Sequence, residues 1–360
     1  MKITTLKFLD SLIGTPLVHA ARLLVPTRKN LSEVERILLI RPGGIGDAVL
    51  LIPAIKAIKQ KYPEAQIDVL GEKRNCGIFS LCPEIRDVYL YDRPKDLWKA
   101  IRNGYDVVID TEQWHRMSAV VGRLTKAPVS IGYSTNERSR FFTHQIPYSH
   151  DDYEAESFIH LIEPVAGTVY FEPDKPFLSV PSGLTDKVSS HLIQLPGRKI
   201  VAIFPGGSIP ERRWEVERFR QVALMLVKEG YGVVAVGGRE DVADGAVISY
   251  GRPEIFNLCG RLSLAETAAV LKEAELLITG DSGIMHIGYG LGVRTLALFG
   301  PGIERKWAPR SSNCAVINKH LDCSPCTKFG YTPVCKKGVE CMNLIGVEEV
   351  CEKAIELMKR

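Results

Sequence analysis

Apolar runs that end in glycine-rich loops occur in both halves of the chain, and this repeat constrains the fold most. Arg36–Arg41 leads into the tight loop 42–46, and a helical periodicity continues from Asp47 to Lys61. Lys199–Phe204 leads in the same way into the loop 205–208. Strands that alternate with helices form parallel sheets with right-handed crossovers. We therefore expect an α/β protein in which two Rossmann-like domains each carry a parallel sheet.

The expected domain boundaries follow from where this alternation stops and restarts. Prolines make residues 150–198 less regular, and we interpret this stretch as the join between the domains. The expected parts are an amphipathic N-terminal segment (1–30), an N-terminal domain (31–175), a C-terminal domain (198–345) and a C-terminal helix (346–360). Ligands of parallel sheets bind beyond the carboxyl ends of the strands, so we expect a ligand cleft that these ends of both sheets face.

Composition and charge exclude several classes of protein. The chain has 360 residues, of which 45% are hydrophobic and 24% charged, as expected for two globular domains. A net charge of +4 gives no reason to expect a nucleic-acid partner, and it suits anionic substrates or a lipid surface. No apolar stretch reaches the ~18 residues of a membrane span, and no secretory signal is recognisable. We therefore expect a cytoplasmic protein.

The first 30 residues form one apolar helical stripe that also carries basic side chains. Leu6, Leu9, Ile13 and Leu17 recur at three or four residues. One interpretation is a helix in the interface of the cytoplasmic membrane, which would hold the protein at the inner face as a peripheral protein. The other is a helix packed on its own domain or on a second copy. The sequence leaves both open.

Glycine-rich loops in the second half predict a binding site for a diphosphate. The loops 205–208, 237–238 and 280–283 all follow predicted strands, so they should meet at one edge of one sheet. Glycine lets backbone amides approach an anion closely, and the first turn of a helix adds free N–H groups. The dinucleotide and Walker fingerprints do not match these loops, which argues against an NAD-dependent oxidoreductase and an ATPase.

Several short motifs, taken in order and spacing, resemble glycosyltransferase family 9, the lipopolysaccharide heptosyltransferases. They extend over about residues 34–355, and the most specific is Asp281–His286. The others are Gly44–Leu50 with Pro53, Ile109–Asp110, Ile131–Gly132, Pro205–Ser208, Arg213–Trp214 with Phe219, Gly237–Gly238 with Glu240, and Cys259–Gly260.

This resemblance implies a GT-B fold and an inverting transfer of a sugar, heptose above all, with no cofactor required. The implied donor is ADP-heptose or a related ADP-linked nucleotide sugar, and the implied acceptor is a lipopolysaccharide-type or other lipid-linked saccharide. The resemblance makes Asp47 the base that takes a proton from the acceptor hydroxyl. The residues alone, without the resemblance, favour a helix cap as the role of Asp47.

The resemblance also implies which residues hold the donor. Arg212 occupies a position where heptosyltransferases often carry Lys, and it would stabilise the leaving diphosphate. Its alternative role is that of a solvated charge, and His286 could likewise be structural. The expected donor-binding residues are Gly206, Gly207, Ser208, Glu240, Asp281, Ser282, Gly283 and His286.

The acceptor side is less well defined by the sequence. Residues 110–116 follow a predicted strand, so we expect their polar groups to face the ligand cleft. This stretch departs from the heptosyltransferases, which makes inheritance of their acceptor unsafe. The candidate acceptor-binding residues are Gly44, Gly46, Arg116, Arg138 and Arg140, and solvated surface charges are the alternative for the three arginines.

Four late cysteines could bind a metal, although no metal is required by the expected chemistry. Cys323 and Cys326 have the spacing of half a zinc site, and Cys335 and Cys341 could complete tetrahedral coordination. The second pair is separated by five residues instead of two. Reduced thiols or a redox-labile pair are the alternatives.

Two other functions fit the same fold. A non-catalytic protein could bind a nucleotide sugar without transferring it, because fold does not fix function. A GT-B sugar-nucleotide epimerase would convert the donor without an acceptor. Retention of both Asp47 and the donor loops favours the transferase.

Overall fold

The computed structural model describes residues 33–192, 195, 199–328 and 331–360. The predicted amphipathic segment 1–30 lies outside these residues. By its internal contacts the chain divides into two compact units, Met1–Phe171 and Glu172–Arg360. No helix in the described residues is both long and apolar enough to cross a bilayer.

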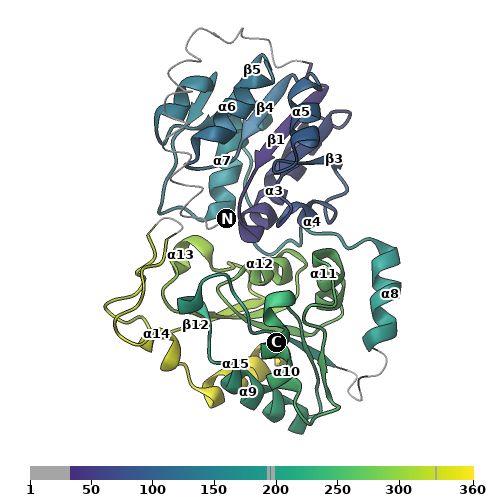
Figure 1. Cartoon of the computed structure of the whole chain (residues 1–360), viewed down its shortest axis with the longest axis vertical. Helices are drawn as coiled ribbons and strands as arrows, with labels where there is room; N and C mark the ends of the chain where they lie inside the picture. The colour runs from purple at the N-terminus through teal and green to yellow at the C-terminus, as the bar shows by residue number, and fades with distance from the viewer. Residues whose placement is uncertain (1–32, 193–194, 196–198, 329–330) are drawn as a thin grey trace. The chain divides into compact units, whose positions relative to one another are not determined.

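The first unit is built on a six-stranded parallel sheet (Figure 1). Its strands, in the order in which they pair, are β3 (Ile85–Leu90), β2 (Gln66–Gly71), β1 (Arg36–Arg41), β4 (Val107–Asp110), β5 (Val129–Tyr133) and β6 (His144–Ile146). The register places Ile40 of β1 beside Asp110 of β4. The loops after β1 and β4 therefore leave the same edge of the sheet side by side.

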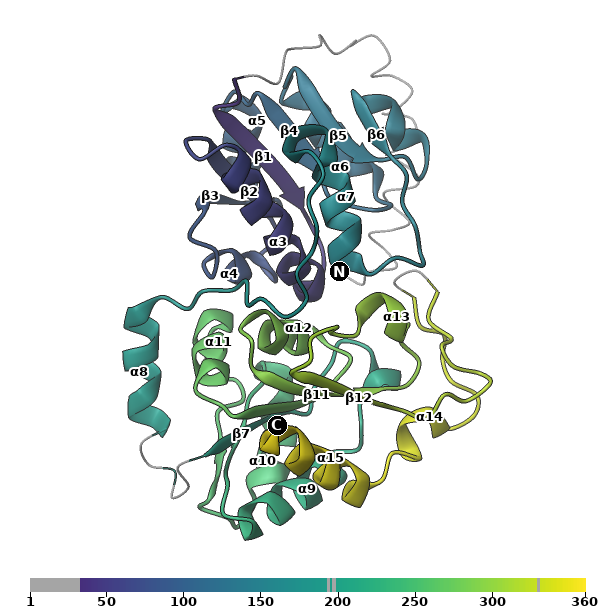
Figure 2. The ribbon, with the colours of Figure 1, turned by 180° about the vertical axis from the view of Figure 1, so that it is seen from behind.

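Helices cover both faces of this first sheet. They are α3 (Ile45–Lys61), α4 (Cys76–Phe79), α5 (Pro94–Arg102), α6 (Arg116–Leu124) and α7 (Glu154–Ala166), with the 3-10 helix η3 (Glu137–Phe141). Helices α3 and α7 pack against each other on one face, and α5 and α6 cover the other (Figures 1 and 2). Strand β1 lies between these layers, and its apolar side chains from Ile37 to Ile40 are fully buried.

The second unit repeats the architecture with another six-stranded parallel sheet. Its strands, in pairing order, are β12 (Cys314–Asn318), β11 (Arg294–Phe299), β10 (Leu276–Gly280), β7 (Ile200–Phe204), β8 (Gly232–Ala235) and β9 (Ile255–Asn257). Because β10, β7 and β8 are neighbours, the three glycine-rich loops that follow them lie at one edge of the sheet, as the sequence predicts.

Helices again lie on both faces of the second sheet. They are α8 (Ser182–Leu192), α9 (Val216–Lys228), α10 (Val242–Ser249), α11 (Leu264–Lys272), α12 (Gly283–Gly290), α13 (Glu304–Trp307), α14 (Glu340–Asn343) and α15 (Val347–Lys359), with 3-10 helices η4 (Pro210–Arg212) and η5 (Arg239–Asp241). Helices α9, α10 and α15 cover one face, and α11 and α12 the other (Figure 2). The expected fold class, two parallel α/β sheets, is therefore confirmed.

The segment 150–198 is more regular than the sequence suggested. It contains α7, with Pro164 inside the helix, and α8. Helix α7 belongs to the first unit because it packs along α3, so the division between the units falls at Phe171 and Glu172. A proline in a helix interior costs stability in isolation, and here the packing of the apolar face of α7 outweighs it.

Helix α11 begins with a capping box, which gives a test of local stability. Ser263 Oγ accepts a hydrogen bond from the Glu266 backbone N–H at 3.3 Å, and Glu266 Oε2 accepts one from Ser263 N–H at 2.8 Å. Ser263→Ala should lower the free energy of unfolding of the second unit by about 1 kcal/mol, measured by urea denaturation. Ser249→Ala, at the partly exposed last residue of α10, is the control and should change it by less than ~0.5 kcal/mol. Equal stability of the two variants would contradict a capping role.

Candidate active site

A tight turn after β1 sets the position of Asp47. Gly43 has a φ of +111°, which only glycine adopts without strain, and Gly44 precedes the first residue of α3 in an extended conformation. The helix begins at Ile45, so Gly46 lies within its first turn and Asp47 at its third position. A Cβ on Gly44 would lie 2.6 Å from Asp47 Oδ2, so the glycine gives room for the carboxylate. The cap residue of α3 is Gly44, with no side-chain cap hydrogen bond, and 22% of the Asp47 side chain is exposed.

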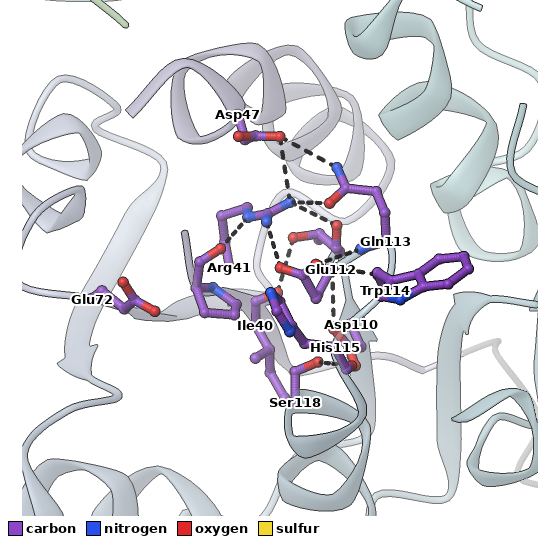
Figure 3. A network of polar contacts seen from close by, with 12 residues as sticks. Ile40, Arg41, Asp47, Glu72, Asp110, Glu112, Gln113, Trp114, His115 and Ser118 are labelled. Carbon is purple, nitrogen blue, oxygen red and sulfur yellow. Dashed lines mark hydrogen bonds and ion pairs between the residues drawn. The ribbon is translucent and has the colours of Figure 1, made fainter. Parts of the chain in front are cut away.

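A buried guanidinium lies beneath this turn (Figure 3). Arg41, the last residue of β1, is 2% exposed and donates to Glu112 Oε2 and to Thr111 O, each at 2.8 Å. Its Nη1 lies 3.9 Å from Asp47 Oδ1. Burial by itself lowers the pKa of Arg41, but neighbouring carboxylates, led by Asp47 and Glu112, more than offset it and raise the pKa. Arg41 therefore remains charged and holds the loops after β1 and β4 together.

Gln113 connects the partly exposed Asp47 to Glu154, a buried carboxylate. Its Nε2 donates to Asp47 Oδ1 at 3.3 Å and also to Glu154 Oε1. Glu154 is fully buried at the start of α7, and Tyr148 donates its hydroxyl to Glu154 Oε2 at 2.8 Å. The side chains of residues 110–113 thus point mainly into the protein, and Trp114, which is 43% exposed, is the next side chain at the surface.

The three arginines that were candidates for the acceptor occupy different environments. Arg138 is fully buried and forms an ion pair with Asp110, which is also fully buried. Its guanidinium also donates to the carbonyl of Glu112, so it supports the loop and presents no surface to an acceptor. Arg116 pairs with Glu137 at 2.8 Å, and Arg140 is exposed.

In the second unit, Asp241 joins two of the glycine-rich loops. A Cβ on Gly206 would lie 2.1 Å from Asp241 Oδ1, and a Cβ on Gly237 would lie 2.7 Å from the Asp241 side chain. Asp241 Oδ2 accepts a hydrogen bond from Gly238 N–H at 2.8 Å. Burial raises the pKa of Asp241. Glu240, the residue predicted from the sequence, is exposed, and Asp241 was not among the predicted residues. The spacing of three residues from Gly238 was the available signal.

The loop after β10 leads directly into α12. Ser282 is the cap of this helix: its Oγ accepts from Met285 N–H at 3.3 Å and contacts Thr279 Oγ1 at 3.1 Å. Gly283 is the first helical residue, so its amide is among those with no acceptor inside the helix. Ser208, at the end of the loop after β7, is exposed, while Gly207 accepts a hydrogen bond from Arg213. These amides and hydroxyls suit an anionic ligand.

Arg212, Asp281 and His286 come together beside these loops. Arg212 Nη1 lies 2.8 Å from Asp281 Oδ2, and Arg212 Nη2 donates to Thr327 Oγ1 at 3.4 Å. Burial, with a smaller contribution from Arg212, lowers the pKa of His286 to about 3, so the imidazole is neutral near pH 7. Arg212 Nε and His286 Nδ1 are buried without a hydrogen-bond partner in the described residues. Such atoms in a native protein call for an explanation, and a bound ligand is one.

The four late cysteines line one pocket in the second unit, together with Glu211. All four are free thiols, and Cys335 Sγ accepts from the backbone N–H groups of Lys337 and Val339 at 3.4 and 3.3 Å. Within the described ranges, no three His, Cys, Asp or Glu side chains lie close enough to hold a metal ion. Zinc binding at Cys323, Cys326, Cys335 and Cys341 therefore stays a prediction from the sequence.

The burial of Arg138 leads to a direct test of its role. Arg138→Leu leaves the Asp110 carboxylate buried without its cation, so the free energy of unfolding should fall by about 3–5 kcal/mol in urea denaturation. Arg140→Leu, on the same 3-10 helix but exposed, is the matched control and should stay within ~0.5 kcal/mol of the wild type. A direct acceptor contact would instead raise the acceptor KM of Arg138→Leu and leave its stability unchanged.

Comparison with known proteins places this geometry in a family. Residues 95–333 match the sequence profile of glycosyltransferase family 9 (heptosyltransferase). Lipopolysaccharide heptosyltransferase 3 of Escherichia coli is 29% identical over 301 residues, which cover 74% of this chain and 84% of that protein. Lipooligosaccharide heptosyltransferase 2 of Haemophilus influenzae is 26% identical over 306 residues, covering 78% and 88%.

Solved structures with the same fold agree with this result. The E. coli ADP-heptose lps heptosyltransferase II superimposes with a TM-score of 0.73 at 23% identity, covering 90% of this chain and 98% of that one. A family 9 glycosyltransferase from Veillonella parvula gives a TM-score of 0.74 at 20% identity, covering 90% and 97%. The chain belongs to glycosyltransferase family 9 (heptosyltransferase), and it is a transferase enzyme with the GT-B fold.

Proposed function

We propose that this enzyme transfers heptose from ADP-heptose or a related nucleotide sugar to a lipid-linked saccharide of the lipopolysaccharide type, with inversion at the anomeric carbon. The single observation that carries this proposal is the Asp47 carboxylate, which is partly exposed and held in place at the start of α3. The names of the relatives, lipopolysaccharide and lipooligosaccharide heptosyltransferases, support the choice of sugar and acceptor.

The second unit supplies the donor site in this proposal. The amides of Gly206, Gly207 and Gly283 bind the diphosphate, and Ser208 adds a hydroxyl. The positive charge of Arg212 stabilises the negative charge that develops on the diphosphate as it leaves. A structure of the heptosyltransferase WaaC with ADP-2-deoxy-2-fluoro heptose, which shares this fold at a TM-score of 0.67, supports an ADP-linked donor.

The remaining donor residues have supporting roles. Neutral His286 offers its unpartnered Nδ1 to the ligand, and Asp281 orients Arg212 through their ion pair. Ser282 fixes the first turn of α12, so it acts mainly through its backbone and the neighbouring amides. Exposed Glu240 accepts hydrogen bonds from sugar hydroxyl groups in this proposal. Asp241 packs against the two glycine-rich loops from inside and fixes their shape.

The reaction then needs one proton transfer and no cofactor. The acceptor hydroxyl oxygen attacks the anomeric carbon, the bond from that carbon to the diphosphate oxygen breaks, and the electron pair leaves with the nucleoside diphosphate. Asp47 takes the hydroxyl proton. Gly44 gives room for this carboxylate, and exposed Arg140 and partly exposed Arg116 are candidates for contact with an anionic acceptor. We place this reaction in the cytoplasm at the inner face of the membrane, since a lipid-linked acceptor lies at a membrane surface.

The role of Asp47 is tested by removing its charge. Asp47→Ala and Asp47→Asn should lower kcat for transfer about 10²–10⁴-fold, because a general base contributes on this scale. Both variants should bind the donor with unchanged affinity in calorimetry, since the donor site lies in the other unit. Normal transfer by Asp47→Ala would contradict the assignment of the base. Conversion of the donor without acceptor would instead support an epimerase.

The role of Arg212 is tested separately. Arg212→Met keeps an apolar stem similar to that of arginine but loses the guanidinium and its charge, and kcat should fall about 10²–10³-fold, the range for loss of one group that stabilises transition-state charge. Arg252→Met removes an exposed arginine from the same unit and should leave kcat unchanged. Equal kcat in the two variants would show that Arg212 does not stabilise the leaving diphosphate.

A further inference from the structure

The Gln113 side chain lies at the centre of the polar network in the first unit (Figure 3). Its Nε2 donates both to Asp47 Oδ1, at 3.3 Å, and to Glu154 Oε1. Its Oε1 accepts from Arg41 Nη1 at 3.4 Å. One amide group thus contacts a guanidinium through its oxygen and two carboxylates through its nitrogen.

The chemistry of these neighbours fixes the orientation of the amide. A guanidinium can only donate hydrogen bonds, and ionised carboxylates can only accept them. If the amide turned over, its oxygen would face Asp47 and Glu154 and its NH₂ group would face Arg41. All three contacts would become repulsive, so a single orientation of Gln113 is stable.

Gln113 is itself held from several sides. Its backbone carbonyl accepts from Thr135 Oγ1 at 2.5 Å, and its backbone N–H donates to Glu112 Oε1 at 3.1 Å. Glu154, the other acceptor of the amide, is fixed by the hydroxyl of Tyr148. With 6% of its surface exposed, Gln113 has little freedom to change rotamer.

Arg41 cannot give Asp47 the same directional restraint. Its Nη1 lies 3.9 Å from Asp47 Oδ1, which is beyond hydrogen-bond distance, so it attracts the carboxylate without fixing its rotation. In the part of the chain that the structure describes, Gln113 is the residue from which the Asp47 carboxylate accepts a hydrogen bond. That bond occupies Oδ1 and leaves Oδ2, the oxygen beside Gly44, for another proton donor.

We propose that Gln113 is a positioning residue that orients the Asp47 carboxylate so that Oδ2 takes the proton of the acceptor hydroxyl. This inference rests on the proposed function, because it presupposes that Asp47 is the base. Gln113 makes no contact with the substrate in this proposal. It acts through the hydrogen bond to Oδ1 and through the rigid connection to Glu154.

Two substitutions remove this restraint in different ways. Gln113→Met keeps the length and volume of the side chain without the amide, and Gln113→Glu places a carboxylate opposite those of Asp47 and Glu154. Both should lower kcat by up to about 10²-fold, the loss expected when a reacting group moves by about 1 Å. The KM for the donor should not change. Gln145→Met, at an exposed position of β6, is the matched control and should keep the wild-type kcat.

A double-mutant cycle separates positioning from a general structural role. In the Asp47→Ala background, Gln113→Met should have no further effect on the residual transfer measured with labelled donor, since there is no carboxylate left to orient. If Gln113→Met lowers this residual rate as strongly as it lowers the wild-type rate, the inference is wrong. Thermal unfolding of each variant accompanies the kinetics, and a loss of rate that only follows the unfolded fraction also overturns it.

The outcomes distinguish this inference from the proposed function. Wild-type turnover of Asp47→Ala removes the base and with it the basis for positioning. Loss of turnover in Asp47→Ala, together with wild-type kcat in Gln113→Met and Gln113→Glu, overturns the positioning role alone.

Discussion

The buried guanidinium of Arg41 is the interaction on which the geometry of the first unit depends. It stands at the carboxyl end of β1, and it binds the loop that follows β4 through Thr111 and Glu112. Leaving such a cation without its carboxylate partners costs several kcal/mol, so separation of the two loops is strongly unfavourable. The pairing of β1 with β4 brings residues about 70 positions apart in sequence onto one charge. Asp47 and Gln113 take their places from this arrangement.

In the second unit a buried carboxylate, instead of a buried cation, holds the loops together. Asp241 is a buried carboxylate packed against Gly206 and Gly237, and it accepts a hydrogen bond from Gly238. Any larger residue than glycine at these two positions would collide with it. In each unit a buried charged side chain therefore fixes the glycine-rich loops from inside.

The sequence predicted the strands whose side chains are buried on both faces, such as β1 and β7, because they are continuous apolar runs. It missed β3, a strand with exposed polar positions, since its pattern resembles a loop. Among the site residues, it placed Asp47 at a helix start and three loops on one sheet edge. It could not foresee that Arg138 is buried, because the partner Asp110 is 28 residues away and only the sheet brings the two together. It also chose Glu240 over Asp241, since neighbouring acidic residues differ in burial and not in chemistry.

The donor site that we propose in the second unit keeps polar atoms unsatisfied in the free protein. Arg212 Nε and His286 Nδ1 are buried without a partner in the residues that the structure describes, and each such atom costs roughly 1–3 kcal/mol. The low pKa of His286 follows from the same burial. In the proposed function, the bound donor supplies the hydrogen-bond partners that these two atoms lack in the free protein. Proteins tolerate such losses of stability at functional sites, because a side chain that is already fixed in its binding position loses no conformational freedom when the ligand binds. The two unpartnered atoms therefore support the proposed donor site through the ion pair of Arg212 with Asp281 and the position of His286 beside the loops, and this support does not come from the family resemblance.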